Sequence, residues 1–303
     1  MLLLSTAIVA ENHGREAGAI GANRVDPDEK LSALRRAALE VRLELIKMFS
    51  YEQVHHFGGC LSCVDILTVL YLYKMKFSAQ CAGDPQRDRF IMSKGHSIPT
   101  QYVLLAMLGI IPKAELATIK QLGTRLQGHP DILKTPCLEA PTGSLGMGLS
   151  YANGIALAAR LDGLKFNVYV LMGDGELQEG QVWEAAMTSS HYGLGNVCVV
   201  VDRNRFQSQG EVERSMGVEP LEAKWRAFGW DTVRIDGHDV RQICDAVDRV
   251  DGQRARPLAI IADTIKGKGV SFLEDTYQYH NGKLSKEQYV RALEEIQESL
   301  TRV

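Results

Sequence analysis

The segment 166–207 restricts the fold of this chain more than any other part of the sequence. Phe166–Met172 is a short apolar run rich in β-forming residues, and Val197–Val201 is a second such run, so both predict buried strands. Between them, Glu179–Tyr192 has the length and the composition of a helix. A strand–helix–strand unit of this size predicts two parallel strands joined by a right-handed crossover.

Polar residues follow both of these predicted strands. Gly173-Asp174-Gly175 ends the first strand in a turn whose backbone we expect only glycine to tolerate, and Asn204 follows the second strand. Neighbouring strands lie ~4.8 Å apart. The Asp174 carboxylate and the Asn204 amide oxygen should therefore converge at the carboxyl edge of the sheet, where open α/β sheets bind ligands.

The chemistry of these two side chains indicates a metal ion and a diphosphate. Hard oxygen ligands suit Mg²⁺ or Ca²⁺, and Mg²⁺ usually shares its coordination shell with phosphates and water. Gly175 would let a phosphate approach the backbone N–H groups of the turn. The alternative is an ordinary strand–helix–strand unit with a polar turn. The turn alone would favour that interpretation, whereas Asn204 at the end of the next strand favours the metal site.

The rest of the chain continues the alternation of helices and strands. It predicts strands at Arg89–Met92, Thr232–Ile235 and Leu258–Ala262, a helix through Leu31–Met48 capped by Asp28, and a closing amphipathic helix at Lys286–Leu300. We therefore expect an α/β fold with a mostly parallel sheet and helices on both faces, in one domain at 26–303. Residues 1–25 are expected to form a flexible extension.

Composition argues against several classes of function. The net charge of −3 argues against a nucleic-acid-binding protein. Met1–Val9 is apolar but too short to span a bilayer, and no basic stretch precedes it, so neither a membrane anchor nor a secretory signal is expected. Six cysteines that are not paired in spacing throughout the chain indicate a reducing, cytoplasmic environment. The one CxxC, Cys60 and Cys63, is interpreted as packed small side chains rather than as a redox or zinc site.

Four further motifs combine glycine with histidine or lysine. They are His55-His56-Phe57-Gly58-Gly59, Ser93-Lys94-Gly95-His96, Gln127-Gly128-His129-Pro130 and Thr264-Ile265-Lys266-Gly267-Lys268-Gly269. Each motif alone is a weak signal, and a pair of surface histidines would be the simpler interpretation of the first. A fifth segment, 142–148, is rich in glycine, but prolines at 136 and 141 prevent the preceding strand that a dinucleotide-binding motif requires, so nicotinamide binding is rejected.

Together these segments resemble the transketolase branch of the thiamine diphosphate-dependent enzymes. The resemblance rests on GDGELQEG at 173–180, on VVDRNRFQ at 200–207 and on the glycine–histidine motifs in the family's order, and it covers residues 28–300. It implies a thiamine diphosphate-binding fold of the diphosphate-binding type, with Mg²⁺ or, in its place, Ca²⁺ or Mn²⁺. The family's metal ligands correspond to Asp174, Asn204 and the backbone carbonyl of Phe206.

The resemblance also implies roles for the other site residues. His56, rather than His55, together with His129 and His280 would orient substrate hydroxyls and shuttle protons, because the pKa of imidazole lies near the working pH. Glu179 would lie at the interface between the two kinds of cofactor-binding domain and take part in catalysis. The residues implied to bind the cofactor are His96, Gly143, Leu145, Gly173, Asp174, Gly175, Glu176, Asn204 and His280. Two loops depart from the family pattern, with Phe57 in place of proline and with Tyr279 and Asn281 altering a Trp-His-Gly sequence.

The resemblance extends only to the first domain of a complete transketolase. In the family a pyrimidine-binding domain and a C-terminal domain follow, and no segment here resembles them. The sequence therefore predicts the N-terminal subunit of a split transketolase, which transfers a two-carbon ketol unit from a ketose phosphate to an aldose phosphate within an α2β2 complex and is inactive without its partner. One alternative is the α-subunit of a 2-oxo acid dehydrogenase or decarboxylase, which would share the GDG turn and Asn204 but not the SKGH, QGHP and TxKGKG motifs. The other is a non-catalytic cofactor-binding subunit.

Overall fold

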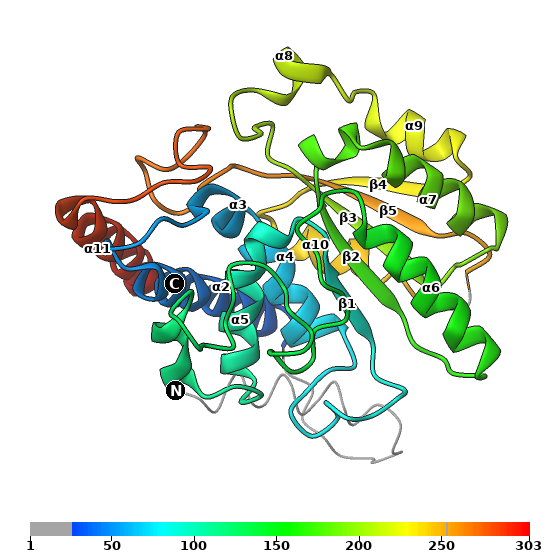
Figure 1. Ribbon diagram of the computed structural model, residues 1–303, viewed down its shortest axis with the longest axis horizontal. Coiled ribbons are helices and arrows are strands. Elements are labelled where there is room, and N and C mark those ends of the chain that lie inside the picture. The colour runs from blue at the N-terminus through cyan, green and yellow to red at the C-terminus, as the bar shows by residue number, and fades with distance from the viewer. Residues whose placement is uncertain (1–25, 253) are drawn as a thin grey trace.

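A parallel sheet positions the other elements of the structure. The computed structural model describes residues 26–252 and 254–303. The sheet has five strands in the order β1-β2-β3-β5-β4, and every pairing in it is parallel (Figure 1). The strands are β1 (Arg89–Met92), β2 (Val168–Gly173), β3 (Val197–Arg203), β4 (Asp231–Asp236) and β5 (Leu258–Asp263). The predicted strands and the predicted parallel pairing of β2 with β3 are confirmed.

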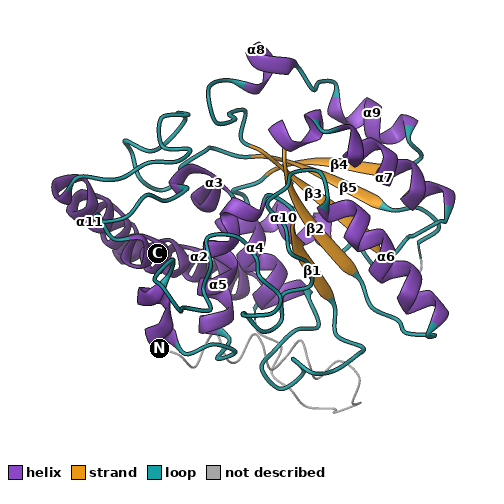
Figure 2. Ribbon diagram, viewed as in Figure 1, coloured by secondary structure: helices purple, strands orange, loops and turns teal. Residues whose placement is uncertain are grey.

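Helices cover both faces of this sheet, as the alternation of elements predicted (Figure 2). One face carries α2 (Pro27–Phe49), α3 (Phe57–Ser62), α4 (Val64–Val69), α5 (Ile98–Met107) and α10 (Val240–Val247). The other carries α6 (Gly148–Leu161), α7 (Gly180–His191) and α9 (Leu221–Ala227). The short helix α8 (Val212–Met216) projects from the top of the molecule in Figure 1, and α11 (Lys286–Arg302) packs against α2.

Short helical turns complete the connections. They are the π-helix η1 (Leu70–Lys74) and the 3₁₀-helices η2 (Gly95–Ser97), η3 (Lys113–Thr118) and η4 (Gly175–Gln178). Two of them, η2 and η4, directly follow the strands β1 and β2, so they bring backbone groups to the carboxyl edge of the sheet.

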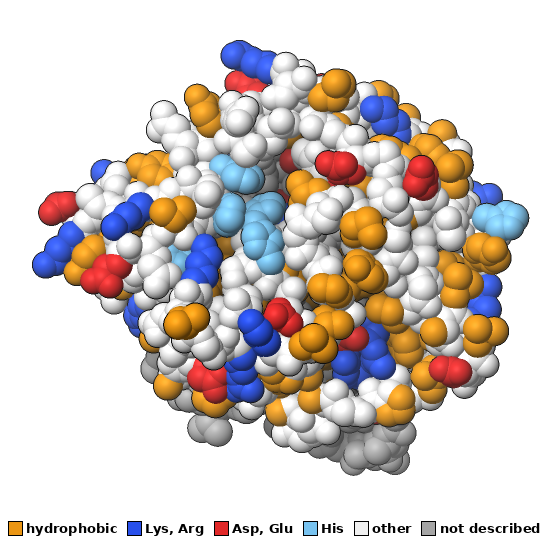
Figure 3. All heavy atoms as spheres, in the orientation of Figure 1, with side chains coloured by type: hydrophobic (Ala, Val, Ile, Leu, Met, Phe, Trp, Pro, Cys, Tyr) orange, Lys and Arg blue, Asp and Glu red, His pale blue; other side chains and the backbone are white. Residues whose placement is uncertain are grey.

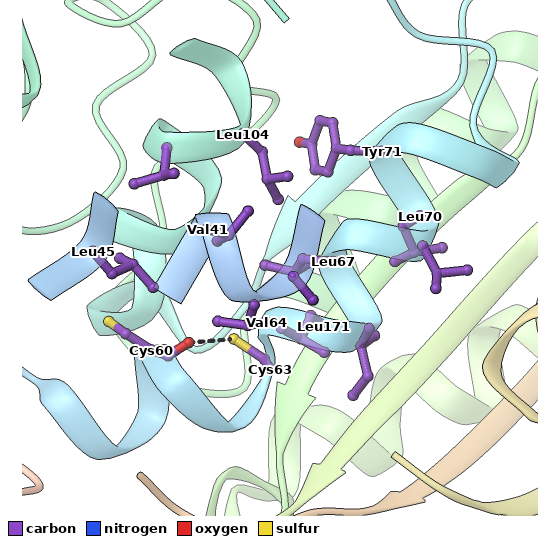
Figure 4. Packing of buried hydrophobic residues seen from close by; sticks show 14 of the residues in the cluster. Val41, Leu45, Cys60, Cys63, Val64, Leu67, Leu70, Tyr71, Leu104 and Leu171 are labelled. Carbon is purple, nitrogen blue, oxygen red and sulfur yellow. Dashed lines mark hydrogen bonds between the residues drawn. The ribbon is translucent and has the colours of Figure 1, made fainter. Parts of the chain in front are cut away.

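Side chains of the central strands alternate between two hydrophobic cores, because successive residues of a strand point to opposite faces. Leu171 packs in the core that also contains Val41 of α2, Leu67 of α4 and Leu104 of α5 (Figure 4). Its neighbour Val170 belongs to the second core, under α6 and α7. The central strands are therefore buried on both faces, which explains their nearly continuous apolar sequence.

Cys60 and Cys63 lie in the first of these cores and not at a reactive surface. Both are fully buried free thiols, and the Cys63 Sγ–H donates to the Cys60 carbonyl oxygen at 3.4 Å (Figure 4). Burial raises the pKa of the Cys60 thiol to about 12 and that of Cys63 to about 11. The interpretation of this CxxC as packed small side chains is supported by this burial, because an un-ionised thiol is a poor nucleophile and metal ligand.

The start of α2 differs from the sequence prediction. Asp26, and not Asp28, is the N-cap residue, and its carboxylate accepts a hydrogen bond from the Asp28 backbone N–H at 2.8 Å. Proline at position 27 explains the earlier start, because proline is favoured in the first helical turn. The prediction for residues 1–25 lies outside the described residues. None of the described helices combines the length and the apolarity needed to cross a membrane.

The two-sided burial of β2 generates a stability prediction. Leu171→Ala should lower the free energy of unfolding by about 2–5 kcal/mol, because it leaves a cavity in a fully buried strand. Leu161→Ala on α6 is the control, since Leu161 is 88% exposed, and it should change the free energy by less than about 0.5 kcal/mol. Urea unfolding of both variants measures the difference, and equal losses would contradict the burial of Leu171.

Candidate functional site

Turns at the carboxyl edge of the sheet enclose a cavity of about 200 Å³. The turns that follow β1, β2, β3 and β5 all contribute to its lining, so residues far apart in sequence meet there. All the site residues proposed from the sequence line this cavity except His56, His129 and Gly143. A larger cavity of about 640 Å³ lies around the residues that precede β2 and β3 and contains none of the predicted site residues. The chemistry therefore points to the smaller cavity.

A buried ion pair joins the turn after β1 to β3 at this edge. Lys94 Nζ donates to Asp202 Oδ2 and to the Gly59 carbonyl oxygen, and both charged residues are at most 2% exposed. The hydroxyl groups of Ser62 and Thr264 also donate to the Asp202 carboxylate. One carboxylate thus connects α3 with the turns after β1 and β5.

The ion pair keeps both of its partners charged. Burial alone would lower the pKa of Lys94, but the Asp202 carboxylate holds it above its ordinary value. Burial alone would raise the pKa of Asp202, but Lys94 and the hydrogen bonds to the carboxylate hold it below its ordinary value. A positive ammonium group consequently lines the cavity at neutral pH.

The Asp202 carboxylate also orients Asn204. Asn204 Nδ2 donates to Asp202 Oδ2 at 3.2 Å, and Asn204 Oδ1 accepts from the Phe206 backbone N–H at 3.2 Å. A carboxylate can accept but not donate, so the amide must turn its NH₂ group toward Asp202 and its oxygen toward the turn after β3. No local sequence pattern indicates this role of Asp202.

Asp174 links the turns after β2 and β3. Its Oδ2 accepts from the Arg205 backbone N–H at 2.6 Å and its Oδ1 from the Gly175 backbone N–H at 2.9 Å. Burial, together with the nearby Asp202 carboxylate, raises the pKa of Asp174 to about 6, while the two backbone hydrogen bonds oppose the rise. The predicted approach of Asp174 and Asn204 is therefore confirmed, since both line one cavity.

Lys266 is a second buried lysine, and it is not among the site residues predicted from the sequence. It is 1% exposed, its Nζ donates to the Phe206 carbonyl oxygen at 2.7 Å, and the same Nζ lies 2.9 Å from His280 Nδ1. Burial lowers the pKa of Lys266 to about 7, against the opposing effect of the Asp174 carboxylate. The signal that could have identified it is a lysine followed by glycine in the turn after a buried strand.

The glycines of the turn after β2 act differently from the prediction. Neither Gly173 nor Gly175 has a φ in the left-handed region, so the expectation that the turn's backbone conformation demands glycine is wrong. Gly175 instead lies in a tight space, because a Cβ there would lie 3.2 Å from Gln207 Cβ and would push it away by a few tenths of an ångström. Its N–H is already bonded to Asp174.

Glu176 uses its carboxylate to connect three loops. The hydroxyl of Ser93 and the Gly146 N–H donate to Oε1, and the Gly173 N–H donates to Oε2. Burial raises the pKa of Glu176 above its ordinary value. Glu179, by contrast, is exposed at the N-cap of α7 and makes no capping hydrogen bond.

Four of the predicted histidines form one cluster beside the cavity. The ring of His56 lies 5.1 Å from that of His96, 6.2 Å from that of His129 and 5.6 Å from that of His280, measured between centroids. In Figure 3 histidine side chains gather beside a depression at the centre of the visible face. Gly143, with a φ of 143°, leaves room for His129, since a Cβ there would lie 2.8 Å from its ring.

The environment of this cluster lowers the pKa of every one of its imidazoles. Burial is the main cause throughout, and it lowers the pKa of His56 to about 4 and that of His280 to about 3. Lys120 adds to the effect at His56 and His129, and Lys94 adds to it at His96. The expectation that these groups titrate near the working pH is wrong, because the cluster is neutral at pH 7.

The two loops that depart from the family pattern are anchored in the core. Phe57 is fully buried and packs edge-on against Phe49. His55 stacks on Phe49 as well and pairs with the Gly282 backbone, which leaves His56 as the histidine in the cluster, as the register predicted. The Tyr279 carbonyl accepts the Gly58 N–H at 3.1 Å, so the two loops hold each other.

The low pKa of His56 generates a prediction about acid stability. Its pKa is about 4 in the fold and about 6.5 in the unfolded chain, so the unfolded chain takes up the proton first and stability falls as the pH drops below about 6.5. His56→Gln should lose less unfolding free energy than the parent between pH 7 and pH 5. The exposed His191→Gln is the control and should behave like the parent. Identical losses for His56→Gln and the parent in urea unfolding would contradict this.

Sequence comparison places the chain among known proteins. Residues 35–297 match the family model of the transketolase thiamine diphosphate-binding domain. The chain is 38% identical to one subunit of the apulose-4-phosphate transketolase of Phocaeicola vulgatus, over 86% of this chain and 93% of that protein. It is 39% identical to 6-deoxy-6-sulfo-D-fructose transketolase subunit SqwG of a Clostridium species, over 90% and 97% respectively. Human transketolase is 35% identical over 89% of this chain but only 43% of its own length.

Solved structures show the same relationship. Transketolase from Campylobacter jejuni superposes with a TM-score of 0.81 at 28% identity, covering 89% of this chain and 45% of that chain. The Leishmania mexicana enzyme gives a TM-score of 0.79 at 26% identity, covering 89% and 44%. The chain thus spans under half the length of these enzymes. On the family match and these relatives, the chain belongs to the transketolase family, of which it carries the thiamine diphosphate-binding domain.

Proposed function

We propose that this chain is the N-terminal subunit of a split transketolase, which transfers a two-carbon ketol unit from a ketose phosphate to an aldose phosphate. The observation that carries the proposal is the meeting of Asp174, Asn204, Lys266 and the histidine cluster at one edge of the sheet. Two relatives that this chain matches over more than nine-tenths of their length are named as transketolase subunits, which supports the division into two chains.

The cavity suits the diphosphate end of thiamine diphosphate. Lys94 supplies a buried cationic group, and a phosphate anion beside Lys266, whose pKa is about 7, would favour its protonated form. Charge-assisted hydrogen bonds from such groups to phosphate oxygens are strong. His96 lines the same cavity as a neutral imidazole that can donate one N–H. At about 200 Å³ the cavity is smaller than the roughly 300–1,000 Å³ of sites that enclose a whole ligand of this class, so part of the cofactor would lie outside it.

The donor set also suits Mg²⁺. Asp174 and Asn204 offer side-chain oxygens and Phe206 a backbone carbonyl, which are hard ligands of the kind Mg²⁺ prefers. The Phe206 carbonyl oxygen accepts a hydrogen bond from Lys266 Nζ, so it is turned toward the side chains that line the cavity. Among the described residues no cluster of three or more His, Cys, Asp or Glu side chains could hold a metal. The proposed metal therefore depends on the mixed set, in which Asp174 is the one charged ligand.

The neutral histidines would bind and orient the substrate. When bound, thiamine diphosphate supplies the nucleophilic carbon that takes up the ketol unit. His56 and the exposed His129 lie outward of His96 and would meet sugar hydroxyls first. A neutral imidazole can accept a hydrogen bond from one hydroxyl and donate its N–H to another, so this cluster can orient a polyol. If it gives up one proton as it takes up the other, it also moves a proton without acquiring a net charge. Gly143 and Leu145 would approach the thiamine end.

The rest of the active site would come from a partner chain with the pyrimidine-binding and C-terminal domains, in an α2β2 complex. Glu179 is exposed beside the cavity and is free to contact such a partner. The six free cysteines support a cytoplasmic location. The 2-oxo acid alternative leaves the SKGH and TxKGKG turns unexplained, although both line the cavity.

Loss of the charged metal ligand tests the site. Asp174→Ala should weaken binding of thiamine diphosphate at least about tenfold, and excess Mg²⁺ should restore it only in part, since a ligand has gone. Asp162→Ala on the exposed end of α6 is the matched control and should bind like the parent. Calorimetric titration with cofactor and Mg²⁺ gives the two affinities. An unchanged affinity for Asp174→Ala would remove Asp174 from the site.

Reconstitution tests the division of the enzyme into two chains. The purified chain alone should transfer no ketol unit from any ketose phosphate, whereas activity should appear when the partner chain with the pyrimidine-binding domain is added. Product analysis with a panel of ketose donors would also identify the substrate. Transfer at a full rate by the chain alone would refute the split-subunit proposal.

A further inference from the structure

We propose that Arg42, Asp65 and His238 form a positioning network that holds Lys266 in the cavity by clamping both ends of the turn 265–268. The proposal rests on the function proposed above, since it concerns the residue that would meet the diphosphate. None of the three residues lines the cavity. Their effect on a ligand would therefore pass through Lys266.

The network begins with a buried ion pair between two helices. Arg42 of α2 donates to both carboxylate oxygens of Asp65 of α4, at 2.9 and 2.6 Å. Arg42 is 4% exposed and Asp65 is 7% exposed. A bidentate pair of this kind fixes both groups in direction as well as in distance.

His238 carries the network to the start of the turn. Its Nδ1 lies 2.7 Å from Asp65 Oδ2, and its Nε2 accepts from the Ile265 backbone N–H at 2.8 Å. The Asp65 carboxylate can only accept a hydrogen bond, so Nδ1 must carry the hydrogen. The Ile265 N–H needs a lone pair on Nε2, so the two neighbours together select one neutral tautomer. His238 is itself held in place because Asp239 caps α10 directly after it.

Arg42 reaches the other end of the same turn. Its Nε donates to the Lys268 carbonyl oxygen at 3.1 Å, while the turn closes on itself through the Lys268 N–H and the Ile265 carbonyl oxygen at 3.2 Å. Gly269 permits this approach, because a Cβ there would lie 2.8 Å from Arg42 Cδ. One cluster therefore binds the N–H before Lys266 and the C=O after it.

The clamp fixes the backbone from which the Lys266 side chain extends. The stem of Lys266 runs against Gly58, where a Cβ would lie 2.7 Å from Lys266 Cγ, and its Nζ then reaches the Phe206 carbonyl and His280. A shift of the turn would move this ammonium group relative to the cavity. Because a long lysine chain has many rotamers, a fixed backbone and the close packing of the stem on Gly58 are what keep its Nζ in one place.

Two substitutions of His238 separate positioning from bulk stability. His238→Gln can place an amide oxygen near Nε2 and still accept from Ile265, whereas His238→Asn keeps a donor toward Asp65 but is too short to reach Ile265. The full-length chain would be titrated calorimetrically with inorganic diphosphate and Mg²⁺, and the melting temperature of each variant measured. We expect His238→Asn to weaken diphosphate binding about tenfold, the effect typical of losing a supporting hydrogen bond, and His238→Gln to bind within about threefold of the parent.

A double-mutant cycle identifies the route of the effect. Lys266→Met should weaken diphosphate binding, and His238→Asn should add nothing further on the Lys266→Met background, because coupled residues are not additive. A parent-like affinity for His238→Asn, or fully additive losses in the double variant, would overturn the positioning role. Failure of the parent chain to bind diphosphate at all would instead refute the proposed cofactor site, and the clamp with it.

Discussion

The ion pair between Lys94 and Asp202 is the interaction on which the rest of the site depends. It connects the turn after β1 with β3 inside the protein, and its carboxylate also accepts hydrogen bonds from Ser62, Thr264 and the amide of Asn204. Compared with apolar residues a buried ion pair adds little stability, but removing one partner leaves an uncompensated charge and is costly. The pair therefore matters through geometry. It holds three turns and one proposed metal ligand in fixed directions before any ligand arrives.

Burial, more than residue type, decides the charge of the cavity. The histidines of the cluster lose their positive charge because burial lowers the pKa of each, whereas Lys94 keeps its charge because Asp202 compensates it. Burial acts on Asp174 in the opposite direction and raises its pKa to about 6. The result is a site in which Lys94 carries a positive charge, the pKa values of Lys266 and Asp174 lie at about 7 and about 6, and the imidazoles serve as neutral donors and acceptors. This combination suits an anion and a hard cation bound side by side.

Local sequence patterns were sufficient for the strands and for the convergence of Asp174 with Asn204. Short apolar runs have few structures available, and the ends of neighbouring parallel strands meet by necessity. The histidines were found through the order of their motifs, and the structure brings their rings within contact distance. Lys94, Lys266 and Asp202 were missed as site residues, because a lysine in a turn is ordinarily solvated and nothing local indicates its burial.

The sequence by itself determined the α/β class, the parallel pairing and the edge of the sheet that carries the chemistry, because hydrophobic periodicity and turn residues act over a few positions. Only the tertiary structure decided the protonation of the histidines, the commitment of Glu176 to Ser93, Gly146 and Gly173, and the clamp on Lys266 by Arg42 and His238. These properties depend on desolvation and on hydrogen bonds between segments up to 226 positions apart, such as Arg42 and Lys268. Such contacts exist only once the turns have been packed together.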